Sequence, residues 1–144
     1  MKKILAPLFF VALALPALAQ MTPVGLWRSI DDSTGEAKAE ISIKDNGKGA
    51  LNGVVERSLV KSTGELNCSL CPDDRKDKPK VGMEIIRGAV KAASEDIWEG
   101  GTIIDPENGK VYKLRLTPIE GGKKLQVRGY IGPFYRNQLW QRVQ

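Results

Sequence analysis

The sequence predicts an all-β domain, an antiparallel up-and-down barrel of about eight strands. Apolar and polar residues alternate over several short runs, as they do in strands with one buried face. Gly, Asn, Asp and Pro separate these runs at nearly even spacing, and helical periodicity is almost absent. Short connections of this kind favour a barrel over a β-sandwich, which usually needs longer crossovers. The sandwich remains the alternative.

The first three predicted strands lie before the long central loop. Asp45-Asn46-Gly47 predicts a tight hairpin between the second and third of them. Gly53 predicts a bulge or bend inside the third, because glycine weakens a straight strand. The three ranges are Val24–Ile30, Ala37–Lys44 and Ala50–Val60.

The fourth and fifth predicted strands follow that loop. They span Met83–Ala92 and Ile97–Asp105. The adjacent Gly100 and Gly101 predict a sharp bend inside the fifth strand. Residues 105–109 read Asp-Pro-Glu-Asn-Gly, with proline and Asn-Gly where a turn requires them, so they predict a hairpin.

The last three predicted strands show the clearest alternation. Tyr112, Leu114 and Leu116 share one face of the sixth strand, and Leu125 and Val127 share one face of the seventh. A turn at Gly121-Gly122 joins these two strands. The ranges are Val111–Leu116, Leu125–Tyr130 and Asn137–Val143.

The first nineteen residues have the three parts of a secretory signal peptide. Lys2 and Lys3 form the charged start, the apolar run covers Ile4–Leu15, and Ala17-Leu18-Ala19 supplies the small-residue cleavage pattern. The run is too short to span a bilayer. We therefore expect cleavage before Gln20 and export to the periplasm or the medium.

Residues 20–144 are expected to form one soluble domain with a single core. The formal net charge of +5 includes Lys2 and Lys3, which leave with the signal. The remaining basic residues alternate with acidic ones along the chain, which argues against nucleic-acid binding and stable membrane insertion. The densest charged run, Asp73–Lys80, contains both signs and predicts a solvated loop, with a weak anionic partner as the alternative.

The sequence contains no histidine, which removes the commonest general base and the usual zinc or haem ligand. Three carboxylate pairs could still do acid–base chemistry, but all three fall in predicted turns, where such residues bond their own backbone. They are Asp31-Asp32, Asp73-Asp74 and Glu95-Asp96. We expect no catalytic residues, no metal and no cofactor, and hence a protein that is not an enzyme.

Cys68 and Cys71 form the one cluster with known chemistry. In an exported chain a C-x-x-C pair is expected to oxidise to a local disulfide. A disulfide that closes so short a loop contributes roughly 2 kcal/mol to stability. We therefore expect it to fix the conformation of the loop and not to hold the whole domain together. A thioredoxin-like redox pair lacks the surrounding βαβ pattern, and structural zinc lacks two further ligands.

Trp27 and Arg142 lie near the two ends of the predicted domain. A barrel closed by pairing its first and last strands would bring them together, with the guanidinium over the indole face. We expect this contact to be a structural closure and not a binding site.

Five parts of the sequence carry a further signal: Trp98–Tyr112, Leu125–Gly132, Gln138–Arg142, Gly25-Leu26-Trp27 and the Cys68–Cys71 pair. Together they resemble an exported bacterial domain-of-unknown-function family, number 2147. The resemblance covers essentially the whole predicted domain and implies a lipocalin-like fold. It brings no established activity and no catalytic residues. One departure is that Tyr135 precedes Arg136, where family members tend to carry Gly-Arg.

The interior of an eight-stranded barrel is either filled by side chains or holds one small ligand. We first expect a periplasmic binding protein for a small apolar or amphipathic molecule. Its candidate lining residues are Tyr112, Leu114, Leu116, Leu125 and Val127. The alternative is a filled barrel that acts as a protein-interaction or inhibitor module through its Cys-containing loop.

Overall fold

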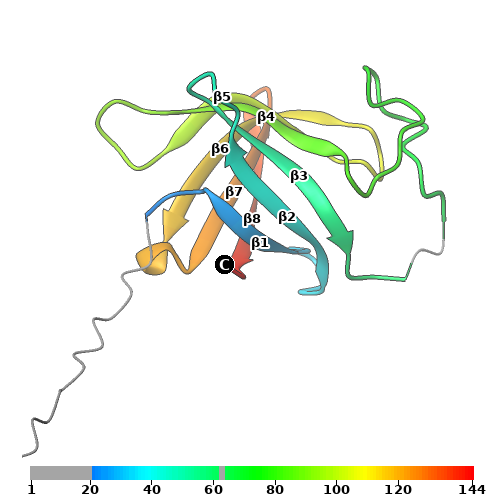
Figure 1. The fold of residues 1–144 in the computed structure, drawn as a ribbon, viewed down its shortest axis with the longest axis horizontal. Coiled ribbons are helices and arrows are strands. Elements are labelled where there is room, and N and C mark those ends of the chain that lie inside the picture. Colours follow the sequence, from blue (N-terminus) through cyan, green and yellow to red (C-terminus); the bar gives the residue numbers. More distant parts are fainter. Residues whose placement is uncertain (1–20, 62–63) are drawn as a thin grey trace, which may run out of the picture.

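The computed structural model describes residues 21–61 and 64–144, which form eight antiparallel strands closed into one barrel in chain order (Figure 1). The predicted fold class is confirmed. The predicted signal peptide, residues 1–19, lies outside the described residues. The strands are β1 Gly25–Ile30, β2 Ala37–Asp45, β3 Leu51–Ser58, β4 Glu84–Lys91, β5 Trp98–Ile104, β6 Val111–Ile119, β7 Lys124–Ile131 and β8 Phe134–Arg142.

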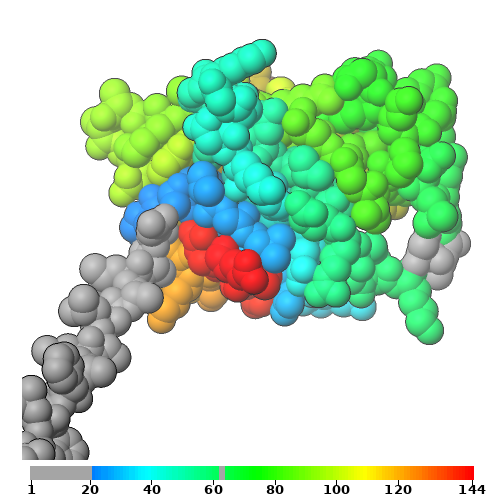
Figure 2. Space-filling view, in the orientation of Figure 1, coloured from blue at the N-terminus to red at the C-terminus, as the bar shows by residue number. Residues whose placement is uncertain are grey.

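The barrel closes by pairing β1 with β8. Trp27 pairs with Arg142 and Arg28 with Gln141, and the backbone N–H of Leu26 donates to the carbonyl of Gln144 at 3.0 Å. Figure 2 shows the first strand and the end of the last side by side on one face. The β1–β8 register pairs lie at the Trp27 end of the two strands, and the part of β8 from Phe134 to Trp140 is not paired with β1 in the described structure.

Two glycines let β4 approach its neighbours closely. A Cβ on Gly53 in β3 would lie 3.1 Å from the Ile86 side chain, and a Cβ on Gly101 in β5 would lie 2.3 Å from the backbone oxygen of Arg87. The pairing register shifts beside Gly53 and again between Glu99 and Thr102. The irregularities predicted at Gly53 and at Gly100-Gly101 are therefore present.

The last two hairpins differ from the predicted ranges. β7 and β8 pair up to Ile131 and Phe134, so β8 begins three residues before the predicted Asn137. β6 continues to Ile119 and is followed by a short 3₁₀ turn, Glu120–Gly122, in place of a simple glycine turn. Strands β6 and β8 are longer than predicted. Their backbone pairing continues beyond the residues whose alternating apolar and polar side chains indicated a strand.

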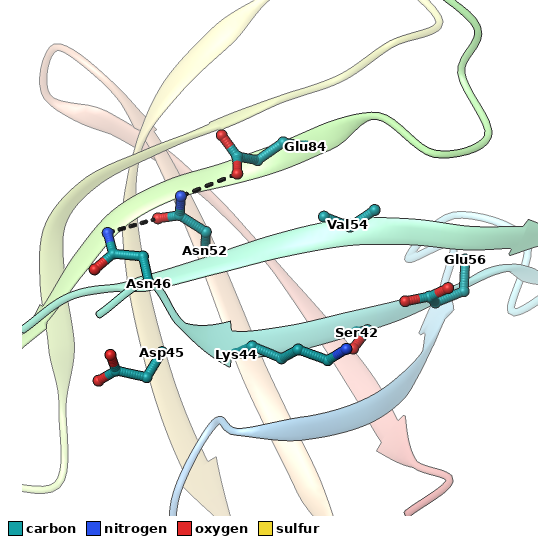
Figure 3. Close-up of a pocket in the computed structure, with 8 residues that line it drawn as sticks. All are labelled: Ser42, Lys44, Asp45, Asn46, Asn52, Val54, Glu56 and Glu84. Carbon is teal, nitrogen blue, oxygen red and sulfur yellow. Dashed lines mark hydrogen bonds between the residues drawn. The ribbon is translucent and has the colours of Figure 1, made fainter. Parts of the chain in front are cut away.

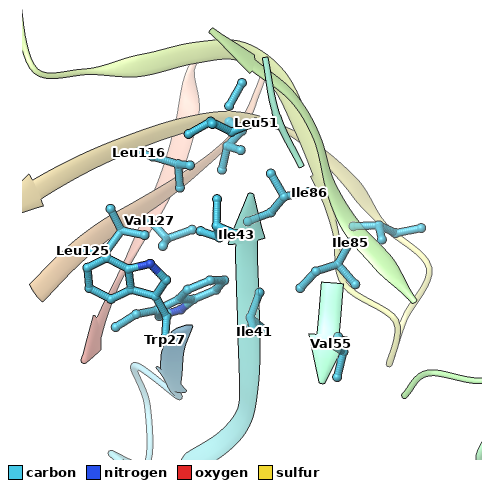
Figure 4. Close-up of a cluster of buried hydrophobic side chains, with 14 of the residues drawn as sticks. Trp27, Ile41, Ile43, Leu51, Val55, Ile85, Ile86, Leu116, Leu125 and Val127 are labelled. Atoms are coloured by element: carbon cyan, nitrogen blue, oxygen red, sulfur yellow. The ribbon is translucent and has the colours of Figure 1, made fainter. Parts of the chain in front are cut away.

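One apolar cluster fills the barrel, and three tryptophans anchor it: Trp27, Trp98 and Trp140. In Figure 4, side chains from β1, β2, β6 and β7 meet at the centre, among them Trp27, Ile43, Leu116 and Leu125. Each of these four is 0% exposed. Aromatic side chains bury large areas, so three of them take up much of the space that an eight-stranded barrel encloses.

No helix in the described part of the chain is long and apolar enough to cross a membrane.

Candidate functional site

The end of the barrel where the chain enters β1 is closed by the Trp27–Arg142 pair. The guanidinium carbon of Arg142 lies 4.2 Å from the Trp27 ring centroid. Arg142 also donates hydrogen bonds of 2.6 to 2.9 Å to the backbone carbonyls of Gly122, Val24 and Thr22. Burial lowers the pKa of this guanidinium. Its donors face protein carbonyls, so the contact ties the first and last strands together.

Four of the five candidate lining residues are buried in the core. Leu114, Leu116, Leu125 and Val127 are at most 5% exposed and belong to the same apolar cluster. The fifth, Tyr112, is half-buried and lies over Gly129, where a Cβ would approach its ring to 3.3 Å. The structure thus brings the five together, but packs four of them against other side chains.

Two hollows among the described residues lie outside the barrel. The first, about 260 Å³, lies on the outer face of β2, β3 and β4 (Figure 3). The amide nitrogen of Asn52 donates to Glu84 at 3.0 Å, and its oxygen accepts from the backbone N–H of Gly88 at 3.0 Å. Asn52 and Glu84 are therefore engaged with each other and with β4, whereas Ser42, Lys44 and Glu56 also line this hollow.

The second hollow, about 420 Å³, lies between β4 and the long segment that precedes it. Arg75 and Arg87 line it, together with Asp74 and Glu84. Neither hollow contains any of the five candidate lining residues. Because Leu114, Leu116, Leu125 and Val127 are at most 5% exposed, this part of the interior is occupied by packed side chains.

The segment preceding β4, residues 64–82, is here called the Cys loop. Cys68 and Cys71 form the predicted disulfide, and both are buried in the apolar cluster. The two arms of the loop are joined by backbone hydrogen bonds: Cys68 N–H donates to Lys78 and Asp77 N–H donates to Cys68, both at 2.8 Å. The loop is therefore an ordered, cross-linked unit.

Two arginines hold the Cys loop against β4. Arg75 is only 5% exposed; it donates to both carboxylate oxygens of Asp73 and, at 3.0 Å, to the backbone carbonyl of Glu84. Arg87 donates to both oxygens of Asp74 at 2.8 and 2.9 Å. Most of the run Asp73–Lys80 is exposed, as predicted, but Arg75 is buried and its contacts help to dock the loop on β4.

The Cys loop nevertheless presents apolar side chains to solvent. Leu66 is 69% exposed, Leu70 65% and Val81 50%. The backbone of Leu70 abuts the turn before β6, since a Cβ on Gly109 would lie 2.0 Å from the Leu70 carbonyl oxygen. Sequence reasoning identified the loop but not these residues. The available signal was two leucines within an otherwise polar segment.

The carboxylates considered for catalysis are engaged in turns and ion pairs. Asp31 accepts hydrogen bonds from Ser33 and the backbone of Thr34, which hold its pKa below the usual range. The guanidinium hydrogen bonds of Arg136 lower the pKa of Asp32 in the same way.

The second carboxylate pair is held by arginines. Hydrogen bonds from Arg75 lower the pKa of Asp73 to about 2, and those from Arg87 lower the pKa of Asp74. Carboxylates whose pKa is lowered in this way are poor general acids at neutral pH. Asp96, from the third pair, forms an ion pair with Lys91 at 3.6 Å. Within residues 21–61 and 64–144, no three Cys, Asp or Glu side chains gather as metal ligands.

Other charged groups were not recognised from the sequence. Glu40 on β2 is only 6% exposed and lies between Arg57 and Arg28, with hydrogen bonds of 2.8 to 3.3 Å. The bonds from Arg57 lower the pKa of Glu40 to about 2.

Arg115 and Arg128 lie opposite each other on β6 and β7. Only the strand register brings such residues together, so no local sequence signal marks them.

Comparison with known proteins agrees with this architecture. A solved structure described as "Protein HP1028 from the human pathogen Helicobacter pylori belongs to the lipocalin family" is similar, with a TM-score of 0.72. The similarity covers 87% of this chain and 85% of that one at 14% sequence identity, so it shows the fold alone. A comparison with curated proteins gave no match. A family profile matches residues 25–142, and the chain belongs to the family described as "Uncharacterized protein conserved in bacteria (DUF2147)".

Proposed function

We propose that this chain is an exported, non-enzymatic binding protein that presents its Cys loop to a protein partner. The lipocalin-like barrel is a fold that often serves binding, with the recognition elements carried at its ends. Here the barrel acts as a rigid support, because its interior is filled. Of the two functions expected from the sequence, the geometry favours the interaction module.

The observation that carries the proposal is the exposure of Leu66 and Leu70 on a cross-linked loop. A large apolar side chain left in water on an ordered segment often marks an interaction site. The disulfide, the paired arms and the docking arginines fix the loop before any partner binds. A pre-organised loop loses little conformational entropy on binding, so two exposed leucines can contribute useful affinity.

A small amphipathic ligand at the opposite end from the Trp27 closure is the second candidate. Residues at the inward-facing positions of β6, β7 and β8 become more exposed toward that end: Tyr112 is half-buried, Ile131 is 51% exposed and Phe134 77%. Arg136, at another inward-facing position, is paired with Asp32. A carboxylate or phosphate group attached to a short apolar tail would suit this mouth.

Site-specific photo-crosslinking tests the main proposal. A photoreactive residue is placed at position 66 or 70, and a control is placed at the exposed Lys48, in the β2–β3 hairpin at the other end of the barrel. We expect adducts of one discrete protein mass from positions 66 and 70 but not from position 48. With the photoreactive group at position 81 instead, we expect the same adduct, and its loss in the Leu66→Ser/Leu70→Ser double variant. Adducts from all positions alike would contradict a specific loop site.

Native mass spectrometry of protein purified from its own compartment separates the two candidates. An unloaded mass with a co-purifying protein supports the Cys-loop proposal. A retained small molecule that is lost in Tyr112→Ala but kept in Leu66→Ser/Leu70→Ser would favour the ligand site at the end of the barrel opposite Trp27.

Fractionation of the cells tests export. We expect a chain that begins at Gln20 outside the cytoplasm, and an uncleaved chain in the cytoplasm would contradict export.

A further inference from the structure

A second surface lies on the outer face of β6, β7 and β8 and includes no residue of the Cys loop. Its members, here called the Arg–Tyr face, are Lys113, Arg115, Arg128, Tyr130 and Tyr135. The strand register places all five on outward-facing positions. The rings of Tyr130 and Tyr135 lie 5.8 Å apart. The guanidinium carbon of Arg128 lies 4.2 Å from the Tyr135 ring centroid and 5.9 Å from that of Tyr130.

The positive charge of this face is only partly balanced. Arg115 and Arg128 are direct cross-strand partners, an arrangement of like charges that destabilises a sheet. Glu99 pairs with Arg115 at 3.0 Å. Among the described residues, Arg128 and Lys113 form no ion pair. Elsewhere on the barrel wall, Arg28, Arg57 and Arg87 each face a carboxylate, so Arg128 differs from these arginines in having no carboxylate partner among the described residues.

Stacking leaves the edge of Arg128 available for an anion. Its Nε donates to Asn137 at 2.7 Å and one terminal nitrogen donates to the Tyr130 hydroxyl at 3.4 Å. The other terminal nitrogen, Nη2, makes no hydrogen bond to any described residue. A guanidinium held flat on a ring is pre-oriented, so it loses less entropy when a carboxylate binds its edge.

We infer that the Arg–Tyr face binds an acidic protein segment through Arg128, Lys113 and the edge of Arg115. Arginine and tyrosine are the residues most enriched at the centres of protein interfaces. None of its residues lines either of the two hollows described above. A surface with an aromatic centre and excess positive charge complements an acidic protein surface. This inference does not depend on the Cys-loop proposal.

The geometry is less suited to a nucleic acid. Single-stranded nucleic acids bind through a basic groove and bases stacked on open aromatic faces. One face of Tyr135 is already covered by Arg128, which leaves less ring surface for a base. Carboxylates need only the guanidinium edge and the lysine ammonium, which are free.

Binding of a fluorescent poly-glutamate peptide, at low and at moderate salt, tests the inference. We expect saturable binding by the intact protein that weakens about tenfold in Lys113→Gln/Arg128→Gln, since two central charge contacts are lost. Tyr135→Ala is expected to weaken binding as well, while Tyr135→Phe keeps it, because the ring and not the hydroxyl orients Arg128.

The matched control is Lys44→Gln/Lys48→Gln, which removes the same charge from the exposed part of the β2–β3 hairpin. Equal weakening in the control, or no effect of Tyr135→Ala, would show attraction to net charge alone and overturn the inference. Tighter, face-dependent binding of heparin or of a single-stranded oligonucleotide would overturn it too, by assigning the face to a different polyanion. Unchanged circular dichroism and melting in each variant separate loss of binding from loss of fold.

Discussion

The two sides of the barrel wall hold their arginines in different ways. On the side formed by β2, β3 and β4, guanidinium groups face carboxylates: Arg57 and Arg28 enclose Glu40, and Arg87 binds Asp74. On the side formed by β6, β7 and β8, Arg128 stacks on Tyr135. In the first arrangement the guanidinium charge is neutralised within the chain and holds strands and the Cys loop together. In the second the guanidinium charge is not neutralised and is available to a partner.

The way each arginine is held indicates whether its surface stabilises the fold or recognises a partner. Carboxylates with strongly lowered pKa values, such as Glu40 and Asp73, are committed to their arginines across the neutral pH range. A cation–π contact orients a guanidinium without neutralising it. We therefore expect substitutions on the first side to change stability and loop order, and substitutions on the second to change binding.

The largest expected effect compares Gly101 in β5, which packs against β4, with Gly129 in β7. In Gly101→Ala the new Cβ would meet the backbone of Arg87 and Gly88 at 2.3 and 2.6 Å, which cannot shift without breaking the β4–β5 contact. We expect a loss of about 3 kcal/mol of unfolding free energy. In Gly129→Ala the Cβ meets the Cβ of Tyr112 at 3.1 Å, which requires only a small shift of Tyr112, so about 1 kcal/mol is expected. Urea unfolding measures both, and equal losses would contradict the assignment.

Arg142→Ala tests an arginine that stacks on a ring and whose N–H groups also bond backbone carbonyls. Its guanidinium covers Trp27 and serves several backbone carbonyls, so its loss leaves buried acceptors unpaired. We expect a loss of about 2 kcal/mol with unchanged binding of any partner by the folded protein. Weakened binding with an unaltered melting temperature would refute a purely structural role.

A smaller effect is expected from Arg87→Gln and Arg128→Gln, which remove one arginine from each side. Arg87→Gln releases Asp74 and Glu84, and should cost about 1 kcal/mol while raising amide hydrogen exchange throughout the Cys loop. Arg128→Gln should cost about 0.5 kcal/mol and leave loop exchange unchanged. An equal rise in the amide hydrogen exchange of the Cys loop in both variants would contradict the distinction between the two sides.

Acid should loosen the Cys loop before the barrel unfolds. The pKa of Asp73 is lowered to about 2, so its contribution is complete above the unfolded value of about 4 and is lost as pH falls toward 2. Hydrogen exchange in residues 64–82 should rise over that window. The Arg128–Tyr135 stack contains no carboxylate and should persist. A loop equally protected at pH 2 and pH 5 would contradict the role of the Asp73–Arg75 pair.

Much of the fold could be predicted because its signals are local. Alternation and turn residues marked all eight strands, and Asn-Gly and double-glycine sequences marked the hairpins and bulges. The disulfide followed from two cysteines three residues apart in a chain expected to be exported. Strand ends were less accurate, since β8 begins at Phe134 only because the Ile131–Phe134 pairing extends the hairpin.

The candidate site was harder to predict because it depends on non-local register and packing. Arg115 and Arg128 are far apart in sequence and become neighbours only when β6 and β7 pair. The alternation of Leu114, Leu116 and Leu125 predicts an inward face, but whether that face meets a ligand or other side chains depends on the volume the tryptophans occupy. Likewise, the buried position of Arg75 within a charged loop follows from its contact with β4.

Titration of the folded protein with an apolar fluorescent probe such as N-phenyl-1-naphthylamine tests most directly whether the barrel interior is filled. We predict no saturable binding and no change in fluorescence of the three buried tryptophans near neutral pH. A one-to-one complex that quenches tryptophan emission, and that survives substitution of both Leu66 and Leu70 by serine, would show an open interior and contradict the account.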